Sequence, residues 1–432
     1  MPKVATLQEG PSISPRAPGG FGSREPVWVT LTGMRSLRVG FFTEVYHPVV
    51  NGVVASVEAL AEGLRTCGHE VYCFTPRMPG YEDPYKPAHR ESILRMPSLP
   101  LPTRTPYRLT LPLVSRRNVN NIIKRLSLVH VHSPFVTGWM GLRYARRYGM
   151  PLVYTYHTQL EAYAHYVPFE PNATRYAASQ LTRRFANQAD AVVVPTPAMA
   201  NHLRELGVVV RIEIVPSGID VDRFGAGVRD GKLRARLGAA PGDRVLLCVS
   251  RLAKEKNLEL LFDALALSGD SRLKLVLAGD GPARDELEEY ARERGVDGQA
   301  TFLGIVERDG LPDLYASADA FVMPSTTETQ GLVQAEALAA GAYVIAADAP
   351  PNRDVLGPAG SIVDPLPEAF AAAFSAIPRE PAREAALLAR KTAQRFSIAA
   401  QVDRMLRLYG SLLPEGDPLL SEGQLTPNVR SL

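Results

Sequence analysis

LRVGFF (37–42), TEVYHPVVNG (43–52), VVASVEALAEGLRTCG (53–68) and HEVYCFTP (69–76) follow one another without a gap. The first and last segments are apolar runs of strand length. Between them, a polar loop leads into apolar residues at helical spacing. A helix between two strands gives the chain enough length to lay those strands parallel. The stretch therefore predicts a βαβ unit, with Gly52 at the start of its helix.

The same alternation of strand and helix continues in two series. Apolar strands are expected in the first series at 126–134, 151–158, 190–197 and 211–218, and in the second at 244–252, 274–281, 301–306, 319–325, 343–348 and 360–364. Near-continuous apolar strands between helices indicate parallel sheets covered on both faces. The expected fold class is α/β, with two doubly wound, Rossmann-like domains whose parallel sheets face each other across a cleft.

The domain limits follow from the break between the two series, near 217–243. We expect a disordered leader over 1–34, a first domain over 35–216, a second over 217–395, a helix over 396–413 that returns to the first domain, and a flexible tail over 414–432. The leader is rich in Pro, Gly and Ser and lacks the apolar core of a signal peptide. Met34 is an alternative start to Met1.

Composition limits the class of protein. A chain of 432 residues with 46% hydrophobic and 22% charged residues has ordinary globular composition and room for two cores. Its longest apolar runs fall short of the ~18–20 residues of a membrane-spanning helix. The three cysteines, Cys67, Cys73 and Cys248, form no CxxC pair, which favours reduced structural thiols in the cytosol.

Charge is divided unevenly along the chain. Residues 85–184 hold fifteen Lys or Arg against three acids, whereas residues 242–409 hold eighteen basic against twenty-five acidic residues. A basic half suggests contact with an anionic surface or partner, and the alternative is an arginine-rich solvated face. No nucleic-acid partner is expected.

Polar residues and glycines follow several of the expected strands. In open α/β sheets, ligands bind beyond the carboxyl ends of the strands. Arg251 and Lys256 of SRLAKEKN (250–257) lie in a turn before a helix, where two cations and free N–H groups suit a phosphate. The alternative is a solvated charge cluster in which Glu255 is the partner.

Four further residues near the ends of expected strands are candidates for the site. Gly279 and Gly281 of GDGP could let a ligand approach the backbone or could form a tight strand–helix turn. Gly52 could offer a second phosphate contact at a helix start. His157 could hydrogen-bond a sugar hydroxyl, or it could be a satisfied loop histidine.

Two patterns that resemble metal sites are set aside. Asp220-Val221-Asp222 is expected to form a turn and helix cap. His130 and His132 lie on one side of a strand without a third ligand at suitable spacing, so a packed pair of core histidines is expected. No metal is predicted.

TTETQGLVQAEALAAG (326–341) contains Glu328 in a polar loop and Glu336 within an apolar helix. An unpaired buried carboxylate is costly, so Glu336 is expected either at a rim or where it binds something. With this pair of glutamates, SRLAKEKN, AGDGP, FLG (302–304) and PSGID (216–220), the chain resembles glycosyltransferase family 4, whose members are retaining enzymes of GT-B architecture. The resemblance runs from about residue 37 to 413.

The resemblance implies roles for individual residues. Arg251 and Lys256 would hold a donor diphosphate, Glu328 would contact the transferred sugar, and Glu336 would take the ribose hydroxyls. Gly52 would lie against the phosphates, and His157 would lie near the sugar and acceptor. The implied catalytic residues are His157, Arg251, Lys256 and Glu328. The donor site would comprise Gly52, Arg251, Lys256, Gly279, Gly281, Leu303, Glu328, Gly331, Leu332 and Glu336.

The subgroup is indicated by FFTEVYHPVVNGVVASV (41–57), YHTQLEAYAHYVP (156–168) and TETQGL (327–332), which resemble diacylglycerol glucosyltransferases and their sulfolipid-forming relatives. Gln330 stands where the wider family usually has Phe, and Tyr343 where a proline is common. The implied reaction moves a hexose, glucose from UDP-glucose, onto a lipid such as diacylglycerol, with no cofactor. The first domain would bind the acceptor, and the second the nucleotide sugar.

Because no carboxylate is placed as a covalent nucleophile, same-face attack is favoured, with the departing phosphate taking the acceptor's proton. Arginines of the basic half would dock on anionic headgroups at the inner face of the cell membrane, leaving the enzyme cytoplasmic and peripherally bound. The alternatives are a mannosyl- or other glycosyltransferase acting on another lipid or a soluble sugar, a two-domain UDP-sugar epimerase, and a non-catalytic binding module.

Overall fold

The computed structural model describes residues 36–49, 51–83, 92–100, 107–112, 117–166, 170–378 and 383–414. They form two compact units, one of residues 36–219 with 397–414 and the other of residues 220–396. We call these the acceptor-side unit and the donor-side unit, after the roles that the sequence suggests. The disordered leader expected over 1–34, and residues 415–432 of the expected tail, lie outside the described residues.

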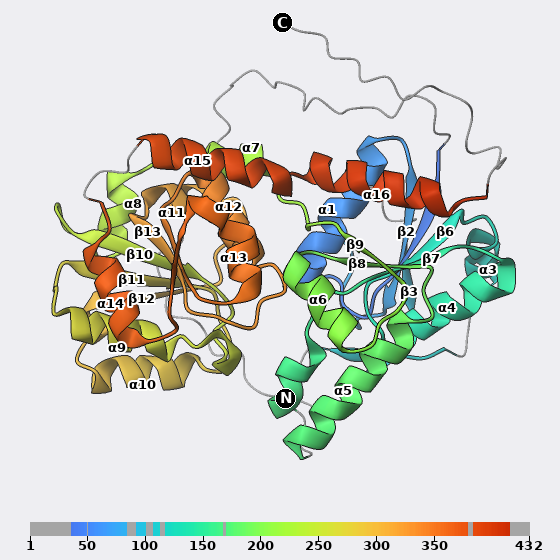
Figure 1. The fold of residues 1–432 in the computed structure, drawn as a ribbon, viewed down its shortest axis with the longest axis horizontal. Coiled ribbons are helices and arrows are strands. Elements are labelled where there is room, and N and C mark those ends of the chain that lie inside the picture. Colours follow the sequence, from blue (N-terminus) through green and yellow to red (C-terminus); the bar gives the residue numbers. More distant parts are fainter. Residues whose placement is uncertain are drawn as a thin grey trace, which may run out of the picture. The chain divides into compact units, whose positions relative to one another are not determined.

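The acceptor-side unit contains a seven-stranded sheet in the order β3-β2-β1-β6-β7-β8-β9, with all neighbours parallel (Figure 1). Its strands are β1 (Arg38–Phe42), β2 (Glu70–Pro76), β3 (Ile93–Met96), β6 (Leu128–Val131), β7 (Leu152–Thr155), β8 (Ala191–Val194) and β9 (Arg211–Ile214). The short antiparallel pair β4 (Ser98–Pro100) and β5 (Arg108–Thr110) stands apart from this sheet.

Helices cover both faces of this sheet. One face packs on α1 (Gly52–Thr66) and α16 (Ile398–Leu412), whose apolar residues share a core with Val39 and Phe41. The other face, which includes Phe42, packs on α4 (Val136–Tyr148), α5 (Pro171–Ala186) and α6 (Pro197–Glu205). Successive strand residues point to opposite faces, so Phe41 and Phe42 enter different cores. The remaining helices here are α3 (Arg117–Ile123) and the 3₁₀ segment η1 (Leu160–Tyr166).

The carboxy-terminal helix completes the acceptor-side core. In Figure 1, α16, in red, lies beside α1, in blue, and the two helices contact each other. Val402, Met405, Leu406 and Tyr409 of α16 are all buried. Its first residue follows Ser397, whose side chain caps the helix by accepting from Ala400 N. Helix α16 is therefore part of the core of the acceptor-side unit.

The donor-side unit has a six-stranded parallel sheet in the order β12-β11-β10-β13-β14-β15. Its strands are β10 (Arg244–Val249), β11 (Leu273–Ala278), β12 (Ala300–Gly304), β13 (Ala320–Met323), β14 (Val344–Ala347) and β15 (Ser361–Val363). Its helices are α7 (Val221–Gly225), α8 (Gly231–Arg236), α9 (Glu259–Ser268), α10 (Arg284–Glu293), α11 (Leu311–Ser317), α12 (Leu332–Ala340), α13 (Pro350–Leu356), α14 (Pro367–Ser375) and α15 (Arg383–Ala393), with short 3₁₀ turns η2 (Lys254–Lys256), η3 (Asp297–Gln299), η4 (Gly357–Ala359) and η5 (Gln394–Phe396).

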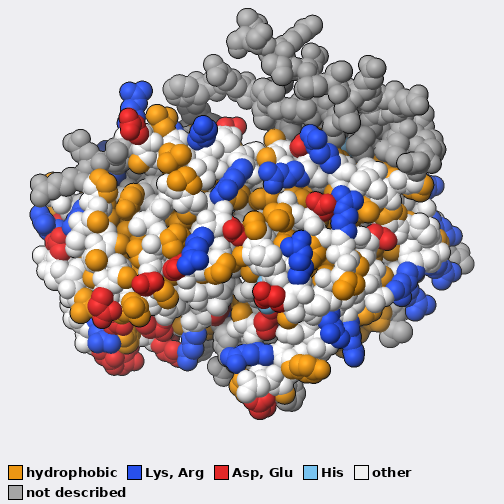
Figure 2. Space-filling view, in the orientation of Figure 1, with side chains coloured by type: hydrophobic (Ala, Val, Ile, Leu, Met, Phe, Trp, Pro, Cys, Tyr) orange, Lys and Arg blue, Asp and Glu red, His pale blue; other side chains and the backbone are white. Residues whose placement is uncertain are grey.

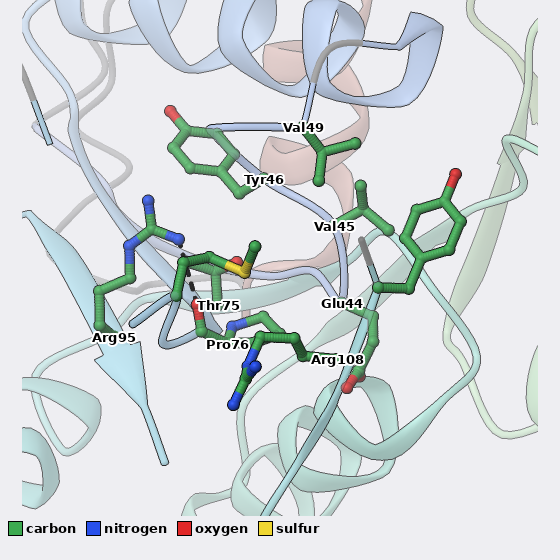
Figure 3. A pocket seen from close by; sticks show the side chains of 10 residues that line it. Glu44, Val45, Tyr46, Val49, Thr75, Pro76, Arg95 and Arg108 are labelled. Carbon is green, nitrogen blue, oxygen red and sulfur yellow. Dashed lines mark hydrogen bonds between the residues drawn. The ribbon is translucent and has the colours of Figure 1, made fainter. Parts of the chain in front are cut away.

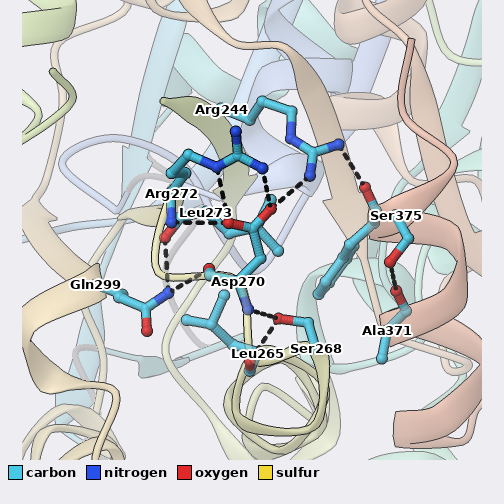
Figure 4. A network of polar contacts seen from close by, with 10 residues as sticks. Arg244, Leu265, Ser268, Asp270, Arg272, Leu273, Gln299, Ala371 and Ser375 are labelled. Carbon is cyan, nitrogen blue, oxygen red and sulfur yellow. Dashed lines mark hydrogen bonds and ion pairs between the residues drawn. The ribbon is translucent and has the colours of Figure 1, made fainter. Parts of the chain in front are cut away.

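A polar network holds the amino ends of the central donor-side strands (Figure 4). Asp270 accepts from Arg272 Nε at 3.2 Å and from Arg244 Nη2 at 2.9 Å, and these bonds lower the pKa of Asp270 to about 2. Arg244 also donates to the Phe374 carbonyl at 3.1 Å, which joins β10 to α14. The network lies at the end of the sheet opposite the loops that carry the candidate site.

Candidate active site

The order of the donor-side strands brings the predicted motifs together. The chain leaves β10 for β11 on one side and later returns to β13 on the other, so β10 borders the point where the strand order reverses. Ligands of open α/β sheets bind at such a point, beyond the carboxyl ends of the strands. Arg251 and Lys256 follow β10, Gly279 follows β11 and Glu328 follows β13. Three neighbouring loops therefore carry these residues.

Lys256 and Glu328 form the central contact of this group. Lys256 Nζ donates to Glu328 Oε1 at 2.5 Å, and the two side chains are 16% and 17% exposed. An ion pair that is largely removed from water is held more rigidly than a surface pair and is screened less by salt. The pair places a cation and a carboxylate side by side at the edge of the site.

Arg251 has the partner that the alternative interpretation assigned to it. Its Nη2 donates to Glu255 Oε1 at 2.7 Å, and the Glu255 side chain is only 2% exposed, whereas that of Arg251 is 41% exposed. The Glu255 carbonyl accepts from Thr327 Oγ1 at 3.1 Å, which ties the loop after β10 to the loop after β13. Glu255 thus orients an exposed guanidinium without removing it from solvent.

Close packing between two loops requires glycine at both glycine positions of GDGP. A Cβ atom on Gly279 would lie 1.9 Å from the Ser250 carbonyl oxygen, and one on Gly281 would lie 2.2 Å from that of Leu252. Gly279 also has φ +137°, a conformation that favours glycine. The two glycines therefore let the loop after β11 pack directly on the loop that carries Arg251.

The loop that carries Glu328 is held by a buried amide network. Asn352 Nδ2 donates to the Ser325 carbonyl at 3.0 Å and to the Ala347 carbonyl at 2.8 Å, and Gln334 Nε2 donates to Asn352 Oδ1 at 2.8 Å. Gly331, at φ +74°, is the N-cap residue of α12, and a Cβ atom on it would lie 2.6 Å from Gln334 Nε2. Gln330, the position that departs from the wider family, is 3% exposed. The roles of Gln334 and Asn352 were missed from the sequence, because the groups they bond to are distant in the chain.

Glu336 has a partner within the protein that sequence reasoning also missed. Tyr315 of α11 is fully buried and donates its hydroxyl to Glu336 Oε2 at 2.8 Å. Burial raises the pKa of Glu336, and the Tyr315 hydroxyl opposes this shift, as do Arg308 and Arg223. The carboxylate in the apolar helix α12 is therefore half-buried and hydrogen-bonded within the protein.

Leu303 and Leu332, also predicted for the donor site, lie at the edge strand β12 and at the first position of α12, and both are half-buried.

The acceptor-side unit carries the other two predicted residues. Gly52 is exposed at the first position of α1, where the side chain of Asn51 caps the helix by accepting from Val54 N at 2.9 Å. His157 follows β7, and its Nε2 lies 3.0 Å from His132 Nδ1. Burial lowers the pKa of His157 to about 4, so the imidazole is neutral at pH 7.

A small pocket adjoins the carboxyl ends of β1 and β2 in this unit (Figure 3). Its charged members are already bonded within the chain. Glu44 accepts from Thr110 N and from Thr137 N, both at 2.9 Å, and Arg95 donates to the Pro76 carbonyl at 3.1 Å. The walls that remain are largely apolar, from Val45, Tyr46, Val49, Pro76 and Met78.

The two patterns that resembled metal sites have structural roles. Asp220 caps α7 by accepting from Arg223 N at 3.0 Å, as expected. His130 in β6 and His132 just after this strand are both buried, which confirms a core histidine pair. Cys73 and Cys248 are buried free thiols whose pKa burial raises to about 12. Within the described ranges, no group of three or more His, Cys, Asp or Glu side chains is arranged to hold a metal ion.

Comparison with known proteins assigns the family. Residues 50–223 match the family described as Glycosyltransferase Family 4, and residues 230–401 match Glycosyl transferases group 1. An alpha-monoglucosyldiacylglycerol synthase of Streptococcus pneumoniae is 32% identical, over 72% of this chain and 71% of its own. The chain belongs to glycosyltransferase family 4.

Other relatives of this family 4 glycosyltransferase have different named activities. A GDP-mannose-dependent alpha-mannosyltransferase of Mycobacterium tuberculosis is 34% identical over 75% of this chain and 82% of its own. A sulfoquinovosyl transferase of Arabidopsis thaliana is 30% identical over 77% of this chain and 61% of its own. Sucrose-phosphate synthase of Thermosynechococcus elongatus superposes with TM-score 0.72 at 22% identity, covering 88% of this chain and 99% of that one, which confirms the GT-B fold.

Proposed function

We propose that this glycosyltransferase moves glucose from UDP-glucose to a lipid acceptor such as diacylglycerol at the membrane surface, with retention of configuration. The observation that carries the proposal is the match to an alpha-monoglucosyldiacylglycerol synthase over most of both chains. An α-linked product from an α-linked nucleotide sugar is the outcome of retention.

The donor-side geometry supports a nucleotide diphosphate sugar as the donor. Arg251 and Lys256 present two cations at the carboxyl end of the central strand, where a diphosphate would gain charge-assisted hydrogen bonds. Glu328, beside Lys256, would accept from sugar hydroxyls. Glu336, oriented by Tyr315, would accept from the two ribose hydroxyls. No cofactor takes part in this scheme.

The chemistry that follows is same-face attack. Negative charge builds on the departing diphosphate, and Arg251 and Lys256 stabilise it in the transition state. The departing phosphate accepts the proton of the acceptor hydroxyl as that oxygen bonds to the sugar. Glu328 is held by Lys256 and serves the sugar hydroxyls in place of a covalent nucleophile. Isolation of a covalent sugar on Glu328 would overturn this mechanism.

Membrane association is supported by two acceptor-side helices. Neither α4 nor α5 contains an acid, and both carry exposed arginines: Arg143, Arg146 and Arg147 on α4, and Arg175, Arg183 and Arg184 on α5. Figure 2 shows basic side chains over these helices, whereas acidic side chains gather over α10. Trp139 and Tyr176 are 41% and 68% exposed on the same two helices, and aromatic residues suit the interface between lipid and water. None of the described helices is long and apolar enough to cross a bilayer.

The reaction is tested with a panel of UDP-glucose, UDP-galactose, GDP-mannose and UDP-sulfoquinovose against diacylglycerol, with the product's anomeric configuration determined by NMR. We expect α-glucosyldiacylglycerol from UDP-glucose, and full activity in EDTA. A β-linked product would overturn retention. A separate incubation with UDP-N-acetylglucosamine and no acceptor tests for an epimerase, which turnover of that donor would indicate.

Membrane docking is tested by flotation with phosphatidylglycerol vesicles at low and high salt. The double substitution Arg183→Glu/Arg184→Glu should weaken binding, because each basic residue near an anionic surface contributes about 1 kcal/mol. Lys232→Glu/Arg236→Glu makes the same charge change on exposed α8 residues of the donor-side unit and should leave binding intact. Equal loss in both variants would mean that net charge, and not these helices, governs binding.

A second candidate is transfer of mannose from GDP-mannose, because the mannosyltransferase of Mycobacterium tuberculosis matches this chain at similar identity. The donor panel separates the two, since a preference for GDP-mannose would select this alternative.

A further inference from the structure

Three histidines stand in a row from the interior of the acceptor-side sheet to the end of β7. The ring centroids of His130 and His132 are 4.1 Å apart, and those of His132 and His157 are 5.3 Å apart. His130 lies between two hydroxyls, with Tyr409 Oη at 2.7 Å from Nδ1 and Thr155 Oγ1 at 2.6 Å from Nε2. His132 has one such contact, between its Nδ1 and His157 Nε2 at 3.0 Å.

The second ring nitrogen of His132 is the informative atom. Nε2 is buried and has no hydrogen-bond partner, while Phe41 packs edge-on against the ring at 4.6 Å between centroids. Burial holds the pKa of both His132 and His157 below the ordinary value, so each ring carries a single proton at pH 7. An orphaned buried N–H is rarer, and costs more, than an orphaned acceptor.

These facts determine where the two protons lie. If His132 carried its proton on Nε2, that N–H would be buried without an acceptor. With the proton on Nδ1, His132 donates to His157 Nε2, and Nε2 of His132 is a bare lone pair in an apolar environment. His157 Nε2 then has to be unprotonated, because it accepts this bond. The single proton of His157 must therefore sit on Nδ1.

We infer that His132 is a positioning residue that fixes His157 as the Nδ1–H tautomer. His157 is then a neutral hydrogen-bond donor through Nδ1, and its basic nitrogen is occupied by His132. The effect of this tautomer on catalysis rests on the reaction proposed above. In that reaction, His157 would donate to an oxygen of the sugar or acceptor and would not remove the acceptor's proton. Proton removal is then left to the departing phosphate.

The tautomer is measured by long-range ¹H–¹⁵N correlation on the full chain labelled with ¹⁵N-histidine, with His157→Gln identifying the His157 signals. We expect a protonated Nδ1 and a bare Nε2 for His157. His69 supplies an internal reference of the opposite form, because its Nδ1 accepts from Leu37 N at 3.1 Å. A proton on Nε2 of wild-type His157 would overturn the inference. The NMR measurement does not depend on enzymatic activity.

Variants test the coupling between the two residues. His132→Leu should lose the single tautomer of His157 and lower kcat by about tenfold with little change in the KM for donor. His132→Asn places an N–H donor near the former position of Nδ1, so it should recover most of the single His157 tautomer and most of kcat. Thr155→Val breaks a buried histidine bond of the same sheet and should leave the His157 tautomer unchanged. An unchanged tautomer and kcat in His132→Leu would contradict the inference.

The two proposals fail separately. If His157→Ala keeps full activity while the wild-type spectrum shows the Nδ1–H form, the role of His157 in catalysis is wrong and the tautomer stands. Should His132→Leu fail to fold by circular dichroism, the wild-type spectrum and His132→Asn still decide the matter.

Discussion

Lys256 Nζ and Glu328 Oε1 are 2.5 Å apart, although 72 positions separate the two residues in the chain. The lysine follows β10 and the glutamate follows β13, so adjacent placement of these strands in the sheet brings the charges together. Glu255, the acid next to Lys256 in its own loop, pairs with Arg251. The contact is thus a product of the sheet order.

The coupling between Lys256 and Glu328 can be measured in a double-mutant cycle with Lys256→Met and Glu328→Gln. Because both side chains are largely buried, we expect a coupling of about 1–2 kcal/mol in the free energy of unfolding. Each single variant should also lower kcat/KM by about 100-fold or more. The exposed pair Lys254–Glu286, at 3.7 Å, is the matched control and should show a coupling near zero. Equal coupling in the two pairs would contradict the prediction.

Tyr315 and Glu336 are expected to act together on donor binding. Glu336→Gln should weaken UDP binding by about 10- to 100-fold, because the ribose would lose charge-assisted hydrogen bonds. Tyr315→Phe should weaken it less, since the carboxylate remains but is no longer oriented. Tyr290→Phe removes a comparable bond, from Tyr290 to Asp263 at 2.9 Å, and should leave UDP affinity unchanged in calorimetry. Unaltered affinity in Glu336→Gln would refute its role at the ribose.

The glycines of GDGP should be intolerant of alanine. Gly281→Ala would place a Cβ atom 2.2 Å from the Leu252 carbonyl oxygen, so the loop of Arg251 would have to shift. We expect a loss of about 2–4 kcal/mol in unfolding free energy, together with a fall in activity. Gly231→Ala is the control, because no atom lies within 4 Å of its Cβ position and its φ is not positive. Urea denaturation of both variants checks the prediction, and a stable, active Gly281→Ala would contradict it.

The histidine row predicts acid sensitivity below pH 6.5. Burial lowers the pKa of His130, His132 and His157 in the folded protein, to about 4 for His157, whereas the unfolded chain titrates near 6.5. Between these values the unfolded state binds more protons. The stabilisation is therefore complete above pH 6.5 and is lost as the pH falls toward the folded pKa values, at up to about 1.4 kcal/mol per pH unit for each histidine.

Urea midpoints at pH 7.5 and 5.5 measure this effect. We expect a lower midpoint at pH 5.5, and a smaller difference between the two midpoints in His132→Leu, which removes one of the three imidazoles of the row. Identical midpoints at both pH values in the wild-type protein would show that the row does not resist protonation.

Much of the fold could be predicted from the sequence. The apolar runs around Val39, Leu246 and Val276 fall in strands, and the alternation of helix and strand predicted two parallel sheets, because buried parallel strands require apolar residues on both faces. The strand β3, the pair β4 and β5, the helix α3 and the 3₁₀ segment η1 were not predicted. Their short segments carry no sustained periodicity, so their conformation depends on the surrounding packing.

The candidate site divides in a similar way. Arg251, Lys256, Gly279, Gly281 and Glu328 could be selected from the sequence, because each follows an apolar strand at the end where such sheets bind ligands. Glu255 was also named from the sequence, as a possible partner of Arg251, but the buried partners Tyr315, Gln334 and Asn352 were not. Tyr315 lies on a different helix from Glu336, and Asn352 is 18 positions from Gln334, so only the packing of their elements brings the atoms within hydrogen-bond distance.

By itself the sequence determined which segments are buried, which strand ends carry charge and which family motifs are present, since these depend on local composition and order. Only the tertiary structure decided that Glu255 orients Arg251, that Tyr315 meets the acid of the apolar helix, and that His132 occupies one nitrogen of His157. The physical reason is that hydrogen bonds form over about 3 Å and depend on direction. The order of residue types along the chain specifies neither the distance between two distant side chains nor their relative orientation.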